Sequence, residues 1–412
     1  MESNLKFINH VLLILILTFF ATCTFFSNVQ ASFQPLLGTD LHNQSLYASG
    51  YITMGARTTV GGNVQSATAI TLAADAIVGG NIEAGTAVTL GVAAGVDGYI
   101  QAGSTATLGA SATVQDFIQA GTTATLGADV TVEGELVAGT TVTTGATAVI
   151  GGDILAGTTL TVGADSILRG DVDAGTTTTI AAGVQIDGVL TANSSKTVPP
   201  APIVTNQEDL ITSVQSNLKS LGTGTELVST TFGTNDETLE AGIYSTINYL
   251  TIAIGKTLTL DGKGVDGTWV FNIANYLSFA ADSKVILKDV TNNSSILWNV
   301  LGDKTGATGY TQLGAGAEAR GYIFAKGFVQ TGANALIAGI GNDCGGAYSA
   351  TDFIEFGADS VIGVDNCTNG TVTAITEVPE PASIWLLLLG FFCLMIISRD
   401  KQITFKVIKS AV

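Results

Sequence analysis

Hydrophobic and polar residues alternate in a pattern that repeats every 18 residues between positions 62 and 187 of this 412-residue chain. In the copy at 134–151, the pattern places Leu136, Ala138, Val142, Thr144 and Ile150 on the inside, with glycines near the three expected corners. A period of this size is typical of a solenoid, in which each coil buries its apolar side only by stacking on its neighbours. Three short strands per coil predict a triangular parallel β-helix with coils about 4.8 Å apart.

Two outward columns of these repeats hold threonine, except for Ala69 and Ala87 in the first two copies of one column. Residues 141 and 143 flank the inward Val142, and side chains alternate along a strand, so both point outward. Their hydroxyls should lie about 6.7 Å apart along a strand and about 4.8 Å apart between coils. That mesh is close to the spacing of water oxygens on an ice face. The candidate ice-binding residues are Thr71, Thr89, Thr105, Thr107, Thr123, Thr125, Thr141, Thr143, Thr159, Thr161, Thr177 and Thr179.

A simple strand preference of β-branched residues is the alternative explanation for these columns. The outward residues on another side of the coil do not match from coil to coil, which favours a function for the threonines. These outward residues are Glu83, Gln101, Gln119, Asp153, Asp171 and Asp173. The Asp171-x-Asp173 pair could bind Ca²⁺, but it occurs once, and we interpret it as solvated surface. The repeats are similar to bactofilin-type and hexapeptide-type solenoids, although the second lacks its strict hexapeptide signature here.

A second region follows the Pro-containing linker at 193–202. Thr205 and Glu208 predict a capping box for a helix of about four turns that stops at Gly222. Only strand-like runs separated by Gly, Asn and Asp come after it. The runs are Thr257–Leu260, Trp269–Ile273, Val285–Leu287, Ile296–Val300 and Tyr322–Ala325.

Residues 203–376 resemble the bacterial and fungal ice-binding family, which is built on a discontinuous β-solenoid with one long helix packed beside it. The matching blocks are Leu239–Tyr244, Leu258–Gly262, Trp269–Ile273, Leu297–Val300, Gly321–Ala325 and Gly332–Ala335. The resemblance implies the fold and an ice-binding role. It assigns no individual contact residues, because the ice face of that family is irregular and has no fixed motif.

Both ends of the chain read as sorting signals. Residues 1–31 carry Lys6, a short apolar run and a small-residue cleavage site before Ser32, which predicts a signal peptide. Pro379, Glu380 and Pro381 precede an apolar run and basic residues in the segment 378–401. This segment resembles a PEP-CTERM sorting signal, which implies processing by an exosortase-type protease and delivery to the cell surface, outer membrane or extracellular matrix. A plain C-terminal membrane anchor is the alternative.

Composition narrows the chemistry further. The formal net charge is −18, and nucleic acid is excluded as a partner because phosphate binding needs a basic surface. Cys344 and Cys367 remain once the sorting segments are removed, and an even pair in an exported protein predicts a disulfide. His42 is then the only histidine, which disfavours metal sites and histidine-dependent catalysis. We expect no metal, no cofactor and no enzymatic activity.

The sequence therefore predicts a mainly β protein with an 18-residue-repeat β-helix at 48–192 and an ice-binding-like β-solenoid domain with one packed helix at 203–376. The expected function is adsorption to ice by a secreted or cell-surface protein, after processing by signal peptidase and the sorting protease. A self-associating or adhesive scaffold is the alternative, with extracellular polysaccharide or another copy as partner. An enzyme acting on polysaccharide would need clustered carboxylates beside Lys or Arg, and the repeats do not supply them.

Overall fold

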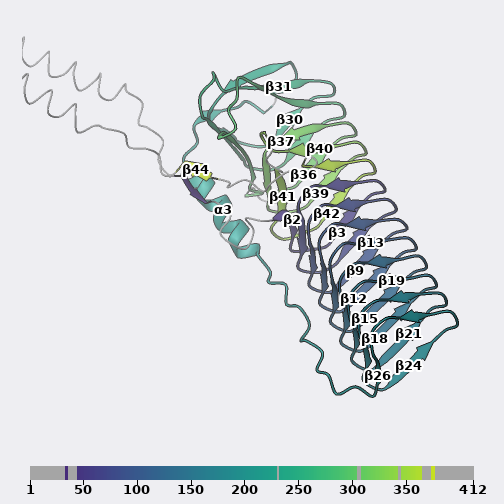
Figure 1. Cartoon of the computed structure of the whole chain (residues 1–412). Helices are drawn as coiled ribbons and strands as arrows, with labels where there is room; N and C mark the ends of the chain where they lie inside the picture. The colour runs from purple at the N-terminus through teal and green to yellow at the C-terminus, as the bar shows by residue number, and fades with distance from the viewer. Residues whose placement is uncertain are drawn as a thin grey trace, which may run out of the picture. The chain divides into compact units, whose positions relative to one another are not determined.

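The computed structural model describes residues 33–35, 44–229, 232–303, 308–341, 345–363 and 373–375. Residues 44–363 form a parallel β-solenoid in which successive coils contribute strands to three long sheets (Figure 1). The predicted three-sided β-solenoid is confirmed. The N-terminal β1 (Phe33–Pro35) pairs only with β44 (Thr373–Ile375).

Sheet 1 has 13 strands and contains the threonine columns. In spatial order its strands are β24 (Thr177–Ile180), β21 (Thr159–Val162), β18 (Thr141–Thr144), β15 (Thr123–Leu126), β12 (Thr105–Leu108), β9 (Ala87–Leu90), β6 (Ile70–Leu72), β3 (Ile52–Met54), β42 (Ile354–Phe356), β39 (Val329–Thr331), β36 (Thr311–Leu313), β33 (Leu277–Phe279) and β30 (Leu250–Ile252).

Sheet 2 has 15 strands and lies against the helix. Its order is β26 (Leu190–Ala192), β23 (Val172–Ala174), β20 (Ile154–Ala156), β17 (Leu136–Ala138), β14 (Ile118–Ala120), β11 (Ile100–Ala102), β8 (Ile82–Ala84), β5 (Asn63–Ser66), β2 (Gln44–Ala48), β41 (Gly346–Ser349), β38 (Tyr322–Ala325), β35 (Ser295–Val300), β32 (Thr268–Ile273), β29 (Gly242–Thr246) and β27 (Thr225–Glu226).

Sheet 3 has 14 strands. Its order is β25 (Gln185–Ile186), β22 (Ile167–Leu168), β19 (Val149–Ile150), β16 (Thr131–Val132), β13 (Thr113–Val114), β10 (Gly95–Val96), β7 (Ile77–Val78), β4 (Thr59–Val60), β43 (Val361–Ile362), β40 (Leu336–Ala338), β37 (Glu318–Arg320), β34 (Lys284–Lys288), β31 (Thr257–Asp261) and β28 (Glu237–Glu240).

The inside of each repeat coil is filled by the residues that the pattern selects. Leu136, Ala138, Val142 and Ile150 are fully buried, and Thr144 is 3% exposed. The Thr144 hydroxyl accepts a hydrogen bond from the Gly163 amide at 3.2 Å, so its polar atom is satisfied inside the core. The predicted inward set is confirmed.

Glycine is needed at the corner between sheets 2 and 1 because adjacent coils approach closely there. A Cβ placed on Gly139 would lie 2.0 Å from the carbonyl oxygen of Gly121 in the preceding coil. The same clash recurs at Gly157 and Gly175. The A-G-T step of the repeat therefore reflects backbone packing from one coil to the next.

The two sequence regions meet inside one continuous stack of coils. The first described coil, formed by β2, β3 and β4, pairs with the first repeat on one side and with β41, β42 and β43 on the other. Ile52 is in register with Ile354, and Thr59 with Val361. Arg57 donates two hydrogen bonds to the Asp359 carboxylate, at 2.6 and 2.8 Å, across this junction. The division of the chain into two domains at the linker 193–202 remains a prediction from the sequence.

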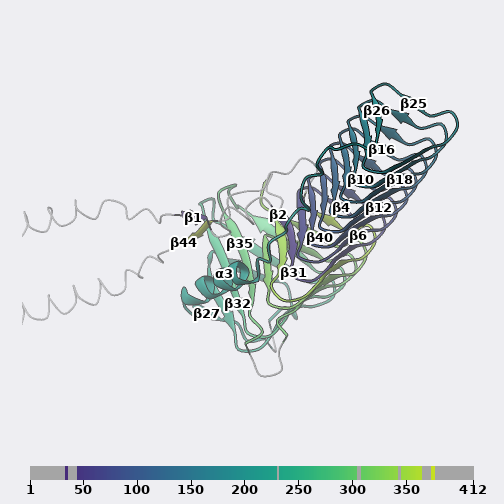
Figure 2. The same cartoon turned by 90° about the horizontal axis from the view of Figure 1, so that it is seen from below.

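The single described α-helix, α3 (Glu208–Ser220), lies beside β32 and β35 of sheet 2 (Figure 2). Ile211, Val214 and Leu218 are buried in a cluster with aromatic and aliphatic residues of that sheet. The Gln215 side chain, which is also buried, donates to the carbonyl oxygens of Val300 at 2.9 Å and Phe324 at 3.0 Å. The helix is therefore fixed to the solenoid by apolar packing and by a satisfied buried amide.

The predicted capping box is wrong. The helix begins at Glu208, and Asn206 accepts the Glu208 amide at 2.9 Å. The Asn206 oxygen also accepts the Tyr47 hydroxyl at 2.9 Å, so packing against the first coil selects this turn in place of the Thr205 cap. Gly222 follows the helix at φ +104°, as the predicted stop requires.

The predicted signal peptide at 1–31, the sorting motif at Pro379–Pro381, and both Cys344 and Cys367 lie outside the described residues. Among the described residues, no helix is long and apolar enough to cross a membrane.

Candidate functional site

The structure brings all twelve predicted threonines together on the outer surface of sheet 1. Adjacent strands pair without a shift, so that Thr105, Thr123 and Thr141 follow one another in register, as do Thr107, Thr125 and Thr143. The second column also continues beyond the repeats, because Thr53 pairs with Thr71. Sequence analysis missed Thr53 because it lies before the first 18-residue copy. The signal in the sequence that could have identified Thr53 as outward was its position directly before the inward Met54.

The hydroxyls of these two columns face away from the protein. Among the described residues, none of the twelve predicted threonines has a side-chain hydrogen bond to another protein group. Thr71, Thr89, Thr107 and Thr125 are exposed, and each has a buried inward residue on both sides. The hydroxyls are therefore available to water or to another hydrogen-bonding surface.

A third hydroxyl column at the neighbouring corner behaves differently. Thr122 donates to the carbonyl oxygen of Ser104 at 2.9 Å, and Thr140 donates to that of Thr122 at 2.8 Å. The bonds repeat along the solenoid through Thr86, Ser104, Thr158 and Thr176. These hydroxyls satisfy the backbone between coils, so the corner column has a structural explanation that the two sheet 1 columns lack.

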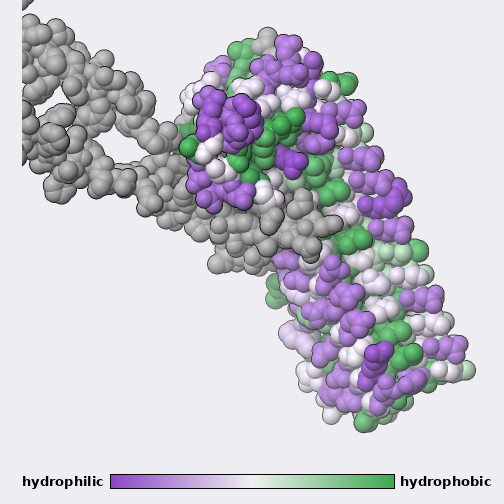
Figure 3. Space-filling view, turned by 45° about the horizontal axis from the view of Figure 1, so that its top comes forward, coloured by the Kyte–Doolittle hydropathy of each residue, from purple (hydrophilic) through white to green (hydrophobic). Residues whose placement is uncertain are grey.

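The threonine part of sheet 1 is electrically neutral and regular. Its two outward columns between positions 69 and 179 hold only threonine and two alanines, Ala69 and Ala87. Strand pairing sets a spacing of about 4.8 Å between coils. On the face seen in Figure 3, hydrophilic residues recur from coil to coil along the solenoid. A flat surface with repeating methyl and hydroxyl groups is suited to binding ordered water.

The same two columns continue through the C-terminal half of the solenoid with different side chains. The column of residue 143 passes through Glu355, Gln330, Gln312, Ser278 and Thr251. The column of residue 141 becomes a ladder of stacked rings with centroids 4.9–5.1 Å apart. The ladder consists of Tyr51, Phe353, Phe328, Tyr310, Tyr276 and Tyr249. Sequence analysis missed the ladder because the intervening loops differ in length.

The polar column of this half is hydrogen-bonded within itself. Gln312 donates to Gln330 at 3.4 Å, and Gln330 donates to Glu355 at 3.0 Å. Tyr51 donates to the same carboxylate at 2.7 Å, and this bond raises the pKa of Tyr51 to about 12. Gln312, Gln330 and Glu355 are therefore less available to external water than the threonines are.

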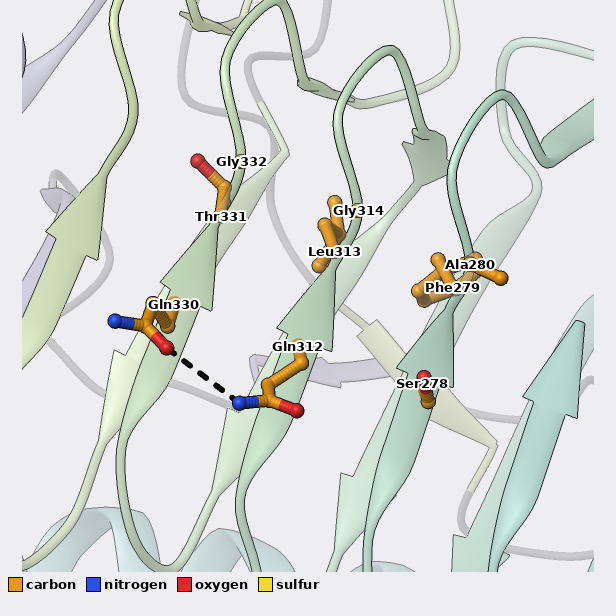
Figure 4. A pocket seen from close by; sticks show the side chains of 9 residues that line it. All are labelled: Ser278, Phe279, Ala280, Gln312, Leu313, Gly314, Gln330, Thr331 and Gly332. Carbon is orange, nitrogen blue, oxygen red and sulfur yellow. Dashed lines mark hydrogen bonds between the residues drawn. The ribbon is translucent and has the colours of Figure 1, made fainter. Parts of the chain in front are cut away.

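A shallow groove of about 380 Å³ lies over these strands. Figure 4 shows Ser278, Gln312 and Gln330 on three parallel strands at its floor, with the hydrogen bond between the two glutamines. Its polar groups are amides and hydroxyls. It offers no ionisable group for acid–base chemistry, since its lining residues carry none.

The outward residues of sheet 2 are partly covered by the linker. Lys196 lies 2.5 Å from the Asp173 carboxylate, and Gln119 donates to the Pro200 carbonyl at 3.0 Å. Asp171 accepts the Val189 amide at 2.9 Å. The interpretation of Asp171 and Asp173 as solvated surface is therefore wrong for Asp173, which is 4% exposed. Burial alone would raise the pKa of Asp173, but hydrogen bonds led by the Lys196 ammonium lower it.

The described residues contain no group of three or more His, Cys, Asp or Glu side chains placed to hold a metal ion. Two carboxylates on or beside the repeats are ion-paired: Asp173 with Lys196 of the linker, and Asp359 with Arg57 of the first coil.

The fold and the surface define a class: a three-sided parallel β-solenoid with one packed helix and one flat, threonine-bearing sheet. The family described as Ice-binding-like matches residues 139–362, which is more than half of the chain. The chain belongs to this family. The match begins within the repeats, earlier than the resemblance at 203–376 suggested.

An ice-binding protein from Leucosporidium sp. (strain AY30) is 36% identical over 101 residues, which is 24% of this chain and 35% of that protein. The chain thus matches about a third of the length of this relative.

Two solved structures are also similar to the chain. The ice-binding protein from an Antarctic Biological Consortium is 12% identical, with a TM-score of 0.40, covering 82% of this chain and 93% of that one. The ice-binding protein from the Antarctic ascomycete Antarctomyces psychrotrophicus is 22% identical, with a TM-score of 0.30, covering 52% and 91%.

Proposed function

We propose that the protein binds ice through the threonine columns of sheet 1. The observation that carries the proposal is the contrast between two kinds of hydroxyl in the same coils. Corner hydroxyls such as that of Thr140 donate to backbone carbonyls, whereas those of Thr141 and Thr143 project outward without a described partner. Membership of the ice-binding-like family supports the same function.

The physical basis is a preformed lattice. Each threonine contributes a hydroxyl that anchors a water molecule and a methyl group that orders the water beside it. A net hydrogen bond contributes only about 0.5–1.5 kcal/mol, so useful affinity needs many contacts made at once. The paired strands hold the columns rigid, so little conformational entropy is lost when the surface meets ice. No chemical step is involved, and we propose a non-enzymatic role.

Export is part of the proposal. The signal peptide at 1–31 and the sorting segment at 378–401 support delivery to the cell surface, outer membrane or extracellular matrix, with signal peptidase and an exosortase-type protease as processing partners. Intact mass measurement of protein recovered from the source cells should give a chain that begins at Ser32 and ends near Pro379. A chain that keeps the apolar segment 384–397 at the surface would favour a membrane anchor.

Ice shaping by the purified chain tests the function itself. Crystals held just below the melting point should become faceted, and the freezing point should fall below the melting point. An inert protein at equal concentration provides the control for colligative effects. Crystals that stay round, together with protein that assembles into filaments, would favour the scaffold function instead.

A further inference from the structure

One end of the solenoid is open. The last strand of each sheet at this end, β24, β25 and β26, has a hydrogen-bonded neighbour on one side only. All three strands belong to the final repeat coil, residues 175–192. Unpaired strand edges of this kind present rows of free backbone donors and acceptors, and soluble proteins normally cover or protect them. Terminal repeats of solenoids likewise need a polar cap.

The interior of this final coil is exposed. Leu190 is 45% exposed, whereas its equivalents Val172 and Ile154 in the two preceding coils are fully buried. Ile180, Val184 and Ile186 are only partly buried against the core. The end of the coil therefore exposes apolar side chains to solvent, and the strands around them have no neighbour on that side.

The final coil also contains an unsatisfied polar atom, the hydroxyl oxygen of Thr178. It occupies the inward column of Val142 and Leu160, and its oxygen is buried without a hydrogen-bond partner. A buried hydroxyl without a partner is unfavourable. It lies on the terminal strand β24, which has a neighbouring strand on one side only.

The described part of the chain does not cover this end. The linker turns back along sheet 2, where Lys196 contacts Asp173 and the Pro200 carbonyl contacts Gln119. At the opposite end β27, β28 and β30 also have one neighbouring strand each, but the apolar interior is covered there, because Phe232 packs on the core and Gly233 accepts the Ala253 amide at 2.9 Å. Leu250 and Ile252 on the terminal strand there are 0% and 1% exposed.

We infer that the open end docks on the same end of a second copy, giving a two-fold symmetric, end-to-end dimer. A two-fold axis through the middle of sheet 1 would pair β24 with its own copy in antiparallel fashion and exchange β25 with β26. Such isologous contacts use one patch twice. The final coil is suited to this, because its single charged residue, Asp187, is hydrogen-bonded to Gln185 at 2.7 Å.

The covered interior of the opposite end favours an assembly of two copies, since Leu250 and Ile252 there are buried whereas Leu190 is exposed. The dimer has a consequence that rests on the proposed function. With the axis through sheet 1, the threonine columns of both copies would face the same side and form one longer surface. Two linked surfaces bind more tightly than one because the second contact becomes intramolecular.

Sedimentation velocity of the full chain tests the inference. We expect a wild-type mass of two chains. Leu190→Lys, which buries a charge in the interface, should weaken the dimer at least tenfold, and Leu190→Gln should weaken it less. Ile77→Lys is the matched control: Ile77 is 44% exposed on sheet 3, away from the end, and its variant should remain dimeric. Circular dichroism of each variant checks that it is folded.

Three results would overturn the inference: a wild-type monomer at micromolar concentrations, a Leu190→Lys variant as dimeric as wild type, or assemblies that grow beyond two copies. Failure of the dimer leaves ice binding by a single chain intact. Ice shaping measured on the same samples therefore separates this inference from the proposed function.

Discussion

A single bulky residue in the middle of the threonine columns tests how sheet 1 works. Thr125 is exposed on β15, with Thr107 and Thr143 in register on the neighbouring strands. In Thr125→Tyr, the ring reaches roughly 4 Å beyond the threonine methyl by standard bond lengths. Hydrogen bonds to ordered water tolerate only about 0.5 Å of variation in distance. A rigid sheet therefore cannot bring the threonines on both sides of the ring to ice together.

The expected magnitude follows from counting contacts. The predicted surface has twelve threonines, and a sheet tilted on a central protrusion keeps at most half of them in contact. With about 0.5 kcal/mol per net contact, the loss of roughly six contacts costs about 3 kcal/mol, or about a hundredfold in affinity. The free energy of unfolding should change by less than about 0.5 kcal/mol, because Thr125 is an exposed strand position away from core and turns.

Thermal hysteresis against protein concentration measures the effect, and thermal denaturation checks the fold. Thr113→Tyr is the matched control, since Thr113 is also an exposed strand threonine but lies on sheet 3. The control should keep wild-type hysteresis. If Thr125→Tyr shapes ice as well as Thr113→Tyr does, the lattice argument for sheet 1 is refuted.

Three further predictions concern a corner glycine, a buried carboxylate and the two cysteines. Gly139→Ala should lower the free energy of unfolding by about 1–3 kcal/mol, because the new Cβ would lie 2.0 Å from the Gly121 carbonyl oxygen. An unchanged denaturation midpoint would show that adjacent coils can move apart at this corner without a loss of stability. Lysine hydrogen bonds hold the pKa of Asp261 well below its usual range, so their stabilisation is present above about pH 4 and is lost as the pH falls toward the folded-state pKa. The melting-temperature difference between wild type and Asp261→Asn should therefore shrink from about pH 5 to about pH 2, and a constant difference would contradict it. Cys344 and Cys367 should be disulfide-bonded in exported protein, and free thiols found by mass spectrometry under non-reducing conditions would exclude the bond.

The regular half of the fold could be predicted because equivalent positions in the seven repeats have the same environment. The inward Val142 and the outward Thr143 follow from strand alternation; the first column is apolar in six of the seven copies, and the second is threonine in all seven. The site could be located on one sheet for the same reason. The hydrogen-bonding contrast with Thr140 could not be predicted, since it depends on which corner hydroxyl reaches the carbonyl of the preceding coil.

The joining of the two halves could not be predicted either. Ile52 pairs with Ile354 across about three hundred residues, and the irregular loops of the second half hide its coil register. The helix start shows the same limit: Thr205 and Glu208 fit a local capping pattern, but a tertiary contact from Tyr47 to Asn206 determines the turn. Local patterns predicted the elements, while contacts between distant segments determined their ends and order.

The central claim is that the threonine columns of sheet 1 carry the ice affinity, and adsorption to a single ice crystal tests it most directly. Fluorescently labelled wild type, the double variant Thr107→Lys/Thr143→Lys, and the sheet 3 variant Thr113→Lys/Thr131→Lys would each be exposed to a growing hemisphere of ice. We predict bright adsorption for wild type and for the sheet 3 variant, and little for the sheet 1 variant. Equal adsorption of both double variants would contradict the claim and place ice binding elsewhere on the solenoid.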